Sequence, residues 1–185
     1  MSYSSVPATR TRSTSPLASQ RGAAEANLRL VTFVIGNLDL ALPIHMVYKV
    51  VPQDLVYGSG QYPAGITIVG DQEYTVIDLE DRLFGRSLIH RDSLVPQTME
   101  SQIQSYLLLV QLNTGEYIGI PVSQAPTLVE VPLTEIRVLP LSYRKIDTLS
   151  IASHIVKIQE NDRVKMIFIL DINTLAPSPG RQWFE

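Results

Sequence analysis

From Leu28 onward the chain is a series of short apolar segments rich in Val, Ile, Leu and Tyr. Gly, Pro, Asn or Asp interrupts these segments about every 8 to 12 residues, a spacing typical of an all-β barrel or sandwich. We therefore predict an all-β fold in which helices are limited to short turns. Ten strands are expected, at about residues 29–35, 38–42, 46–51, 65–69, 74–79, 104–112, 116–122, 127–131, 153–159 and 164–170.

Turn residues connect several of these predicted strands. The strongest hairpin signals are Gly36-Asn37, Asn113-Thr114-Gly115 and Asn161-Asp162, because Gly and Asn adopt the backbone angles that tight turns require. Short helical turns are expected after Asp78 and after Asp171, and Gly85 can end the first of them.

The segment 164–170 is apolar at every position except Lys165. A strand without alternating polar positions is typically covered on both faces, so we predict that this one is central in its sheet. The stretch 86–104 is mostly polar, contains Pro96, and is expected to connect two halves of the chain.

The two halves of the chain resemble each other. Residues 37–52 and 115–132 each contain a turn and then a small residue two positions before a proline, Ala41 in the first half and Gly119 in the second. Residues 74–83 and 166–175 each contain an apolar strand that ends in Asp and leads into a short amphipathic turn. The repeat predicts two intertwined β subdomains of about 70 residues each, with a boundary near residues 90–104 and a groove between them.

Asp78 and Asp171 are the equivalent acidic residues of this repeat. Both are expected to be structural caps, because Asp at a helix start accepts hydrogen bonds from backbone N–H groups that otherwise lack partners. A catalytic carboxylate is the alternative interpretation of either residue.

Composition excludes several classes of function. Of the 185 residues, 15 are Lys or Arg and 18 are Asp or Glu, so the net charge of −3 lacks the basic field that nucleic acid binding requires. The absence of cysteine removes disulfides, thiol nucleophiles and thiolate metal sites, and it is consistent with a reducing cytoplasm. No apolar run approaches the roughly 18 residues of a membrane helix, so a soluble protein without direct membrane insertion is expected.

Both ends of the chain differ in composition from the middle. Residues 1–27 are rich in Ser, Thr and Ala, carry no acid before Glu25, and are expected to form a disordered leader. Residues 177–185 are expected to form a tail that contains Trp183 and Phe184. This tail is interpreted either as a docking peptide or as a segment that folds back over an exposed sheet edge.

Motifs that would support catalysis or metal binding are missing. His45, His90 and His154 are far apart in the sequence and none lies in a metal-binding spacing. The Gly58-Ser59-Gly60 run lacks the spacing of a nucleophile elbow and is interpreted as a loop. We therefore predict no metal, no cofactor and no enzymatic activity.

Four segments in this order resemble the CheW-like domain family: FVIGNLDLALPIHMVYKV, AGITIVGDQEYTVIDLEDRLFG, YLLLVQLNTGEYIGIPV and MIFILDINTL. The resemblance covers about residues 28–176. Members of that family couple chemoreceptors to the histidine kinase CheA. The resemblance implies two five-stranded, SH3-like β-barrel subdomains that share a hydrophobic core, with short helical turns and without catalysis. It also implies that the receptor's helical tip binds between the subdomains, and that the kinase joins through subdomain edges.

The resemblance implies a set of receptor-groove residues, and these are Ile44, Val47, Lys49, Val50, Val69 and Gly70. Two of them depart from the family pattern. Lys49 replaces a common acidic residue, and Gly70 stands where the arginine of an Asn-Leu-Arg-Gly run is usual. Plain core packing is the alternative interpretation of each valine.

The function expected from the sequence is a non-enzymatic cytoplasmic adaptor that links a methyl-accepting chemoreceptor or photoreceptor tip to a CheA-type histidine kinase. Association with the membrane would then occur only through receptor arrays. Three alternatives remain open at this stage: a divergent adaptor of type IV pilus motility or another signalling complex, a small β-barrel module that binds a ligand or nucleic acid, and an enzyme that uses Asp78 or Asp171.

Overall fold

The computed structural model describes residues 26–58, 64–85, 105–144, 149–160 and 163–175. Apart from its last two residues, the predicted leader lies outside these ranges. So do the predicted boundary near 90–104, the tail at 177–185, the Asn161-Asp162 turn and His90.

All ten predicted strands are present, together with two short strands that were not predicted, β4 and β10. The strands are β1 Asn27–Ile35, β2 Leu38–Pro43, β3 Val47–Pro52, β4 Tyr57–Gly58, β5 Ala64–Val69, β6 Gln72–Ile77, β7 Tyr106–Gln111, β8 Tyr117–Val122, β9 Thr127–Pro132, β10 Ile136–Val138, β11 Ala152–Glu160 and β12 Arg163–Leu170. The helical segments are η1 Ile44–Met46, α1 Leu79–Phe84, η3 Leu133–Glu135, α2 Leu141–Arg144 and η5 Ile172–Thr174.

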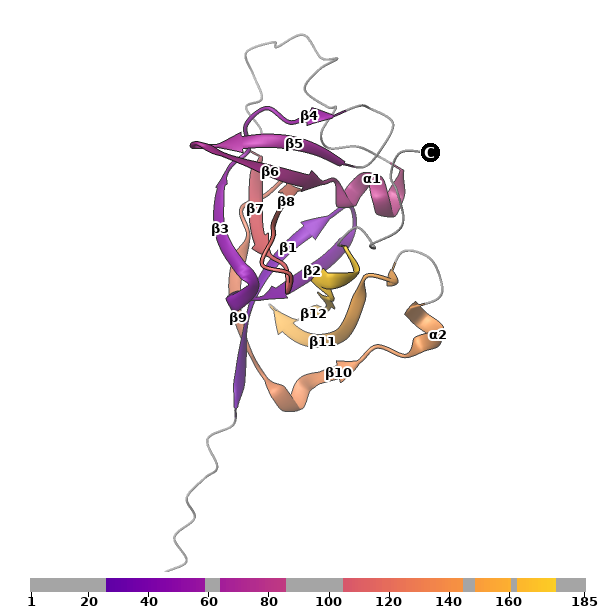
Figure 1. Cartoon of the computed structure of the whole chain (residues 1–185). Coiled ribbons are helices and arrows are strands. Elements are labelled where there is room, and N and C mark those ends of the chain that lie inside the picture. Colours follow the sequence, from indigo (N-terminus) through magenta and orange to yellow (C-terminus); the bar gives the residue numbers. More distant parts are fainter. Residues whose placement is uncertain (1–25, 59–63, 86–104, 145–148, 161–162, 176–185) are drawn as a thin grey trace, which may run out of the picture.

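The strands form two six-stranded sheets (Figure 1). One sheet has the order β10-β11-β12-β2-β1-β9 and the other β3-β7-β8-β6-β5-β4. Each sheet therefore contains five predicted strands and one of the short strands at its edge. The predicted count of five per subdomain is one too low, because two or three residues are too few to show an alternating pattern.

Each half of the chain contributes its first two strands to the sheet that the other half mainly forms. The β1–β2 hairpin joins β9 to β12, and the β7–β8 hairpin joins β3 to β6. Each exchange uses a parallel pair with the same register: Ala41 lies opposite Ile169, and Gly119 lies opposite Val76. The small residue before each proline thus faces the residue two positions before Asp171 or Asp78, which confirms the repeat in three dimensions.

The largest group of buried side chains lies between the two sheets and belongs to both. We call it the shared core; its strand residues are Val31, Phe33, Ile35, Leu40, Leu42, Ile77, Leu108, Val110, Ile118, Ile120, Val122, Ala152 and Leu170. Separate smaller clusters fill the other face of each sheet. Strand β7 shows the division, because Leu108 belongs to the shared core whereas Leu107 and Leu109 belong to the cluster of their own sheet. Apolar residues on both faces of β7 are therefore buried.

Strand β12 lies inside its sheet, between β11 and β2, as predicted. The prediction that it is covered on both faces is wrong for its first half, where Val164 is 53% and Met166 is 44% exposed. The reason is register. Pairing with β2 begins only at Ile167, opposite Asp39, so the start of β12 extends beyond the neighbouring strand.

The turns that follow the two equivalent Asp residues have capped ends. The Asp78 carboxylate accepts hydrogen bonds from the N–H groups of Glu80 and Asp81 at 3.0 and 3.1 Å, and the Asp171 carboxylate accepts one from the N–H of Asn173 at 3.3 Å. Gly85 ends α1 with a φ of 64°, which Gly adopts without strain.

Arg82 connects the two capped turns across the molecule. Its guanidinium donates a hydrogen bond to the Thr174 carbonyl at 3.2 Å, which links α1 to η5. Burial lowers the pKa of Arg82 from its ordinary value, because removal from water disfavours the charged form. The side chain nevertheless stays protonated at neutral pH.

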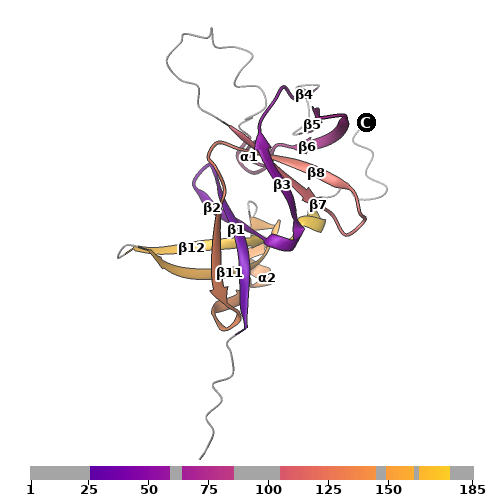
Figure 2. The ribbon, with the colours of Figure 1, turned by 90° about the vertical axis from the view of Figure 1, so that its left-hand side faces the viewer.

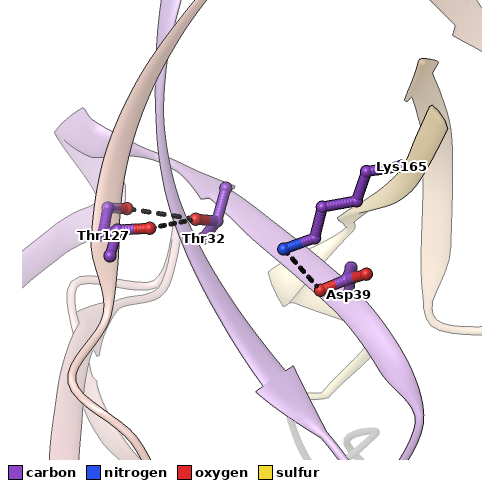
Figure 3. Close-up of polar contacts among 4 residues, drawn as sticks. All are labelled: Thr32, Asp39, Thr127 and Lys165. Atoms are coloured by element: carbon purple, nitrogen blue, oxygen red, sulfur yellow. Dashed lines mark hydrogen bonds and ion pairs between the residues drawn. The ribbon is translucent and has the colours of Figure 1, made fainter. Parts of the chain in front are cut away.

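A threonine pair joins strands from different halves of the chain. The Thr32 hydroxyl on β1 lies 2.8 Å from the Thr127 hydroxyl on β9 and also donates to the Thr127 carbonyl at 3.3 Å (Figure 3). Thr32 is buried, so these contacts satisfy a hydroxyl that is shielded from water.

We expect Leu108→Ala to lower the free energy of unfolding by about 3 kcal/mol, because it removes a fully buried side chain and leaves a cavity. Leu128→Ala is the matched control, since Leu128 is exposed and should cost less than about 1 kcal/mol. Urea unfolding followed by circular dichroism measures both values. Because the shared core belongs to both sheets, we expect a single transition, and two separate transitions would contradict this interpretation.

We expect Thr32→Val to lower the free energy of unfolding by about 1 kcal/mol, because it removes the hydrogen bonds of the Thr32 hydroxyl to Thr127 and keeps the shape of the side chain. Thr75→Val, at an exposed position of β6, is the control and should change stability by less than about 0.5 kcal/mol. The same urea titration compares the two variants. Equal midpoints would show that the buried pair contributes nothing measurable.

Candidate functional site

An edge strand and the turn before it carry four of the six predicted site residues. Ile44 lies in η1, and Val47, Lys49 and Val50 lie on β3 at the edge of its sheet. A bulge between Val47 and Lys49 interrupts the pairing with β7. We call this region, with Tyr48, the β3 surface.

The residues of the β3 surface differ in burial. Ile44 and Val47 are partly buried and pack against the shared core. Tyr48 and Val50 are 54% and 41% exposed, because they alternate with the half-buried residues along the strand. The structure therefore anchors the surface with two aliphatic side chains and presents an aromatic and an aliphatic side chain to solvent.

The lysine of the β3 surface lies beside the first of three tyrosines that contact one another in sequence. The Lys49 ammonium lies 5.5 Å from the centre of the Tyr48 ring, within the range of a cation–π contact. The Tyr48 and Tyr117 rings are 4.9 Å apart, and Tyr117 meets the buried Tyr74 edge to face at 6.4 Å. These contacts hold a positive charge beside an exposed apolar area.

The other two predicted site residues lie elsewhere in the same sheet. Val69 ends β5 and packs against the cluster that contains Tyr74 and Leu107, whereas Gly70 lies in the turn that leads to β6. In the sheet order, β7, β8 and β6 separate β5 from β3. The structure thus groups Ile44, Val47, Lys49 and Val50 but places Val69 and Gly70 apart from them.

Sequence reasoning missed Tyr48 and Tyr117 at this site. The alternation of residues 47–52 placed Tyr48 on the outward face, which was a usable signal. Tyr117 had no such signal, because its contact with Tyr48 crosses β7 and depends on the order of strands.

A second exposed apolar region lies at the edge of the other sheet. It is formed by η3, β10 and α2, which follow one another in the chain, and we call it the β10 surface. Its exposed residues are Leu133, Val138, Leu141 and Tyr143. Figure 1 shows β10 and α2 at the opposite end of the molecule from β4 and β5. Because β3 belongs to the sheet of β4 and β5 and β10 to the other sheet, the β3 and β10 surfaces lie on different sheets.

The described part of the chain offers no arrangement of side chains suited to a metal. Within it, no three His, Asp or Glu residues are close enough to hold an ion. His45 is exposed, and the Nδ1 atom of His154 lies 2.9 Å from the Ser153 hydroxyl. Asp78 is buried with its carboxylate turned to backbone N–H groups, an arrangement that serves helix capping.

Among the residues that the structure describes, no helix has the length and apolar character needed to cross a membrane.

Comparisons with known proteins agree with this architecture. The family model of the CheW-like domain matches residues 29–179. No curated protein matches the sequence. Among solved structures, the scaffolding protein TtCheW from Thermoanaerobacter tengcongensis matches with a TM-score of 0.64 and 22% sequence identity. That match covers 88% of this chain and 96% of TtCheW, and at such low identity it supports the fold alone. Because the family model spans most of the sequence, the chain belongs to the CheW-like domain family.

Proposed function

We propose that this chemotaxis-type scaffold links a receptor's cytoplasmic tip to a CheA-type histidine kinase by binding each partner through a separate surface. The observation that carries the proposal is the pair of exposed apolar regions, the β3 surface and the β10 surface, on different sheets of one molecule. A scaffold that holds two proteins together raises their effective concentration, and it needs no reactive side chain for this purpose. The same function would place the protein at the cytoplasmic end of a receptor array.

The receptor is assigned to the β3 surface. Docking of an amphipathic helix requires exposed apolar side chains with polar neighbours, and Tyr48 and Val50 beside Lys49 provide this combination. Partly buried Ile44 and Val47 support the surface from below. Val69 and Gly70 belong to the proposed site only if the bound helices extend along the sheet to β5.

The kinase is assigned to the β10 surface. Among the described strands, β10 is the outer one of its sheet and pairs with β11 alone. Val138, Leu141 and Tyr143 are exposed there, and exposed apolar residues grouped at a sheet edge are typical of protein interfaces.

The charge at Lys49 favours a receptor whose tip carries acidic side chains at the contact. A receptor with a basic tip would place like charges together, which disfavours binding. Lys49 stands where an acidic residue is common in the family, so the charge at this position is reversed. The reversed charge favours a divergent signalling system, such as one that controls pilus motility, over a chemoreceptor system of the usual kind.

We expect Lys49→Glu to weaken binding of an acidic receptor tip about tenfold and to leave kinase binding unchanged, because only the β3 surface changes charge. Isothermal titration calorimetry with receptor cytoplasmic fragments and the kinase regulatory domain from the same genome measures both. Lys157→Glu, on exposed β11, is the control for net charge. Unchanged affinity for every receptor fragment would remove Lys49 from the interface.

We expect Val138→Glu to weaken kinase binding at least tenfold, because a buried charge at an apolar interface lacks a partner. Receptor binding should stay the same, since the β3 surface lies on the other sheet. Leu55→Glu introduces the same charge at another exposed aliphatic residue, away from the β10 surface, and should affect kinase binding by less than about twofold. Equal loss in both variants would indicate a general effect of charge and contradict the assignment.

A further inference from the structure

One row of side chains crosses the sheet that contains β5 and changes from buried to exposed along the way. Strand pairing places Val110 opposite Ile118 and Ile118 opposite Thr75. Thr75 also pairs with Ile66, and Ile66 pairs with Tyr57. Paired residues point to the same face of a sheet, so this face is continuous from β7 to β4. Its residues on β7 and β8 belong to the shared core, whereas those on β6, β5 and β4 are exposed.

The exposed part of this face carries three large apolar side chains. Tyr57, Ile66 and Ile68 are 64%, 50% and 52% exposed, and we call them the β5 surface. Ile66 and Ile68 lie two positions apart on one strand and therefore share a face. Strands β4 and β5 lie at the opposite end of the molecule from β11 (Figure 2). The face that forms the shared core thus continues into an apolar area that the described residues leave open to water.

The size of the β5 surface favours an occupant from the same chain. A stable interface between two separate proteins uses roughly 20 to 30 residues on each side, far more than this surface offers. A tethered segment needs less contact, because a short linker gives it an effective concentration on the order of millimolar.

The end of the described chain lies beside the sheet that carries β5. Leu175, which follows η5, is fully buried in the shared core. The Asn173 side chain accepts a hydrogen bond from the N–H of Asn113, in the β7–β8 turn, at 3.3 Å. The Thr174 carbonyl accepts one from Arg82 on α1 at 3.2 Å. The β7–β8 turn and α1 both adjoin strands of that sheet, so the chain continues from this side of the molecule.

The residues that follow are long enough to reach the β5 surface. Residues 176–185 read APSPGRQWFE, and Trp183 is the eighth residue after Leu175. Eight extended residues span about 26 Å. Neighbouring strands are about 4.8 Å apart, so Ile66 lies only about 10 Å across the sheet from Ile118 in the shared core. The segment therefore reaches β5 with length to spare.

The charges near the β5 surface are acidic. Residues 53–81, which include β4, β5 and β6, contain Asp and Glu but no Lys, Arg or His. Glu73 is exposed on β6 beside β5. In the described strands of this sheet the sole cation is Lys49, which lies on β3 at the opposite edge. The segment carries a base, Arg181, before its aromatic pair and an acid, Glu185, after it. Attraction between Arg181 and Glu73 favours one orientation of the segment on the surface.

We propose that residues 181–185 fold back onto the β5 surface, where Trp183 and Phe184 cover Ile66 and Ile68. Trp and Phe supply a large contact area at a low cost in conformational entropy. The contact extends the shared-core face to the edge of the sheet and closes an apolar area to other chains. It forms within one chain and does not depend on the receptor and kinase assignments above.

Trp183 is the only tryptophan of the chain, so its fluorescence reports on this contact directly. Acrylamide quenching compares the full chain with a free peptide of residues 176–185. We expect a quenching constant about threefold lower in the chain, because a covered ring is shielded from the quencher. Ile66→Lys should raise it close to the value of the peptide, since a charge disrupts an apolar contact. Leu128→Lys, at a similarly exposed position of the other sheet, is the control and should leave it unchanged.

The absence of cysteine allows a second test, which locates the segment. Thr75→Cys combined with Gln182→Cys places one thiol beside the β5 surface and one in the segment, and it keeps every apolar residue. We expect mild oxidation to form a disulfide within one chain, because docking brings the two positions close enough for the bond. The control combines Lys157→Cys, at an exposed position of β11, with Gln182→Cys and should react at least tenfold more slowly.

Several results would overturn the proposal. These are equal quenching in the chain and the peptide, unchanged quenching in Ile66→Lys, and equal oxidation rates in the two cysteine pairs. A shielded Trp183 with equal oxidation rates would place the ring against another part of the chain. Disulfide-linked dimers of the variant with Thr75→Cys and Gln182→Cys would assign the segment to a second copy.

Discussion

The shared core between the two sheets is the constraint on which the rest of the structure depends. It takes side chains from β1, β2, β7 and β8, the strands that the two halves exchange. Of these strands, β1, β2 and β7 also contribute residues to the clusters on the other faces of the sheets, as Leu107 and Leu108 of β7 illustrate. Close packing on both faces makes relative movement of the sheets costly. A scaffold benefits directly, because surfaces on different sheets then keep a constant separation.

Much of the fold was predictable from the sequence because its signals are local. The ten predicted strands, the Gly36 turn and the helical turn that ends at Gly85 each follow from patterns within about ten residues. The repeat also predicted the equivalence of Ala41 and Gly119. Strands β4 and β10 were missed because they are short, and their pairing depends on neighbours far along the chain. Exposure of Val164 was missed because it results from where β2 begins.

The candidate site was less predictable than the fold. An alternating strand indicates which residues share a face, but the bulge after Val47 and the edge position of β3 decide how far each is exposed. Val50 and Val69 look alike in the sequence, yet Val50 is exposed at a sheet edge and Val69 packs against a buried cluster. Contacts across strands, such as Tyr48 with Tyr117, require the strand order itself. That order is a property of the whole fold.

The exchange of strands has a consequence for how the protein is made. During synthesis β1 and β2 leave the ribosome first, but the strands beside them in the finished sheet, β9 and β12, are among the last. Apolar side chains of the amino-terminal hairpin that pack with these late strands, such as Leu30 and Ala41, therefore lack most of their cluster until β12 has been made. Pairings this distant in sequence slow folding, so apolar side chains of the newly made chain stay exposed for longer and can contact other unfolded chains.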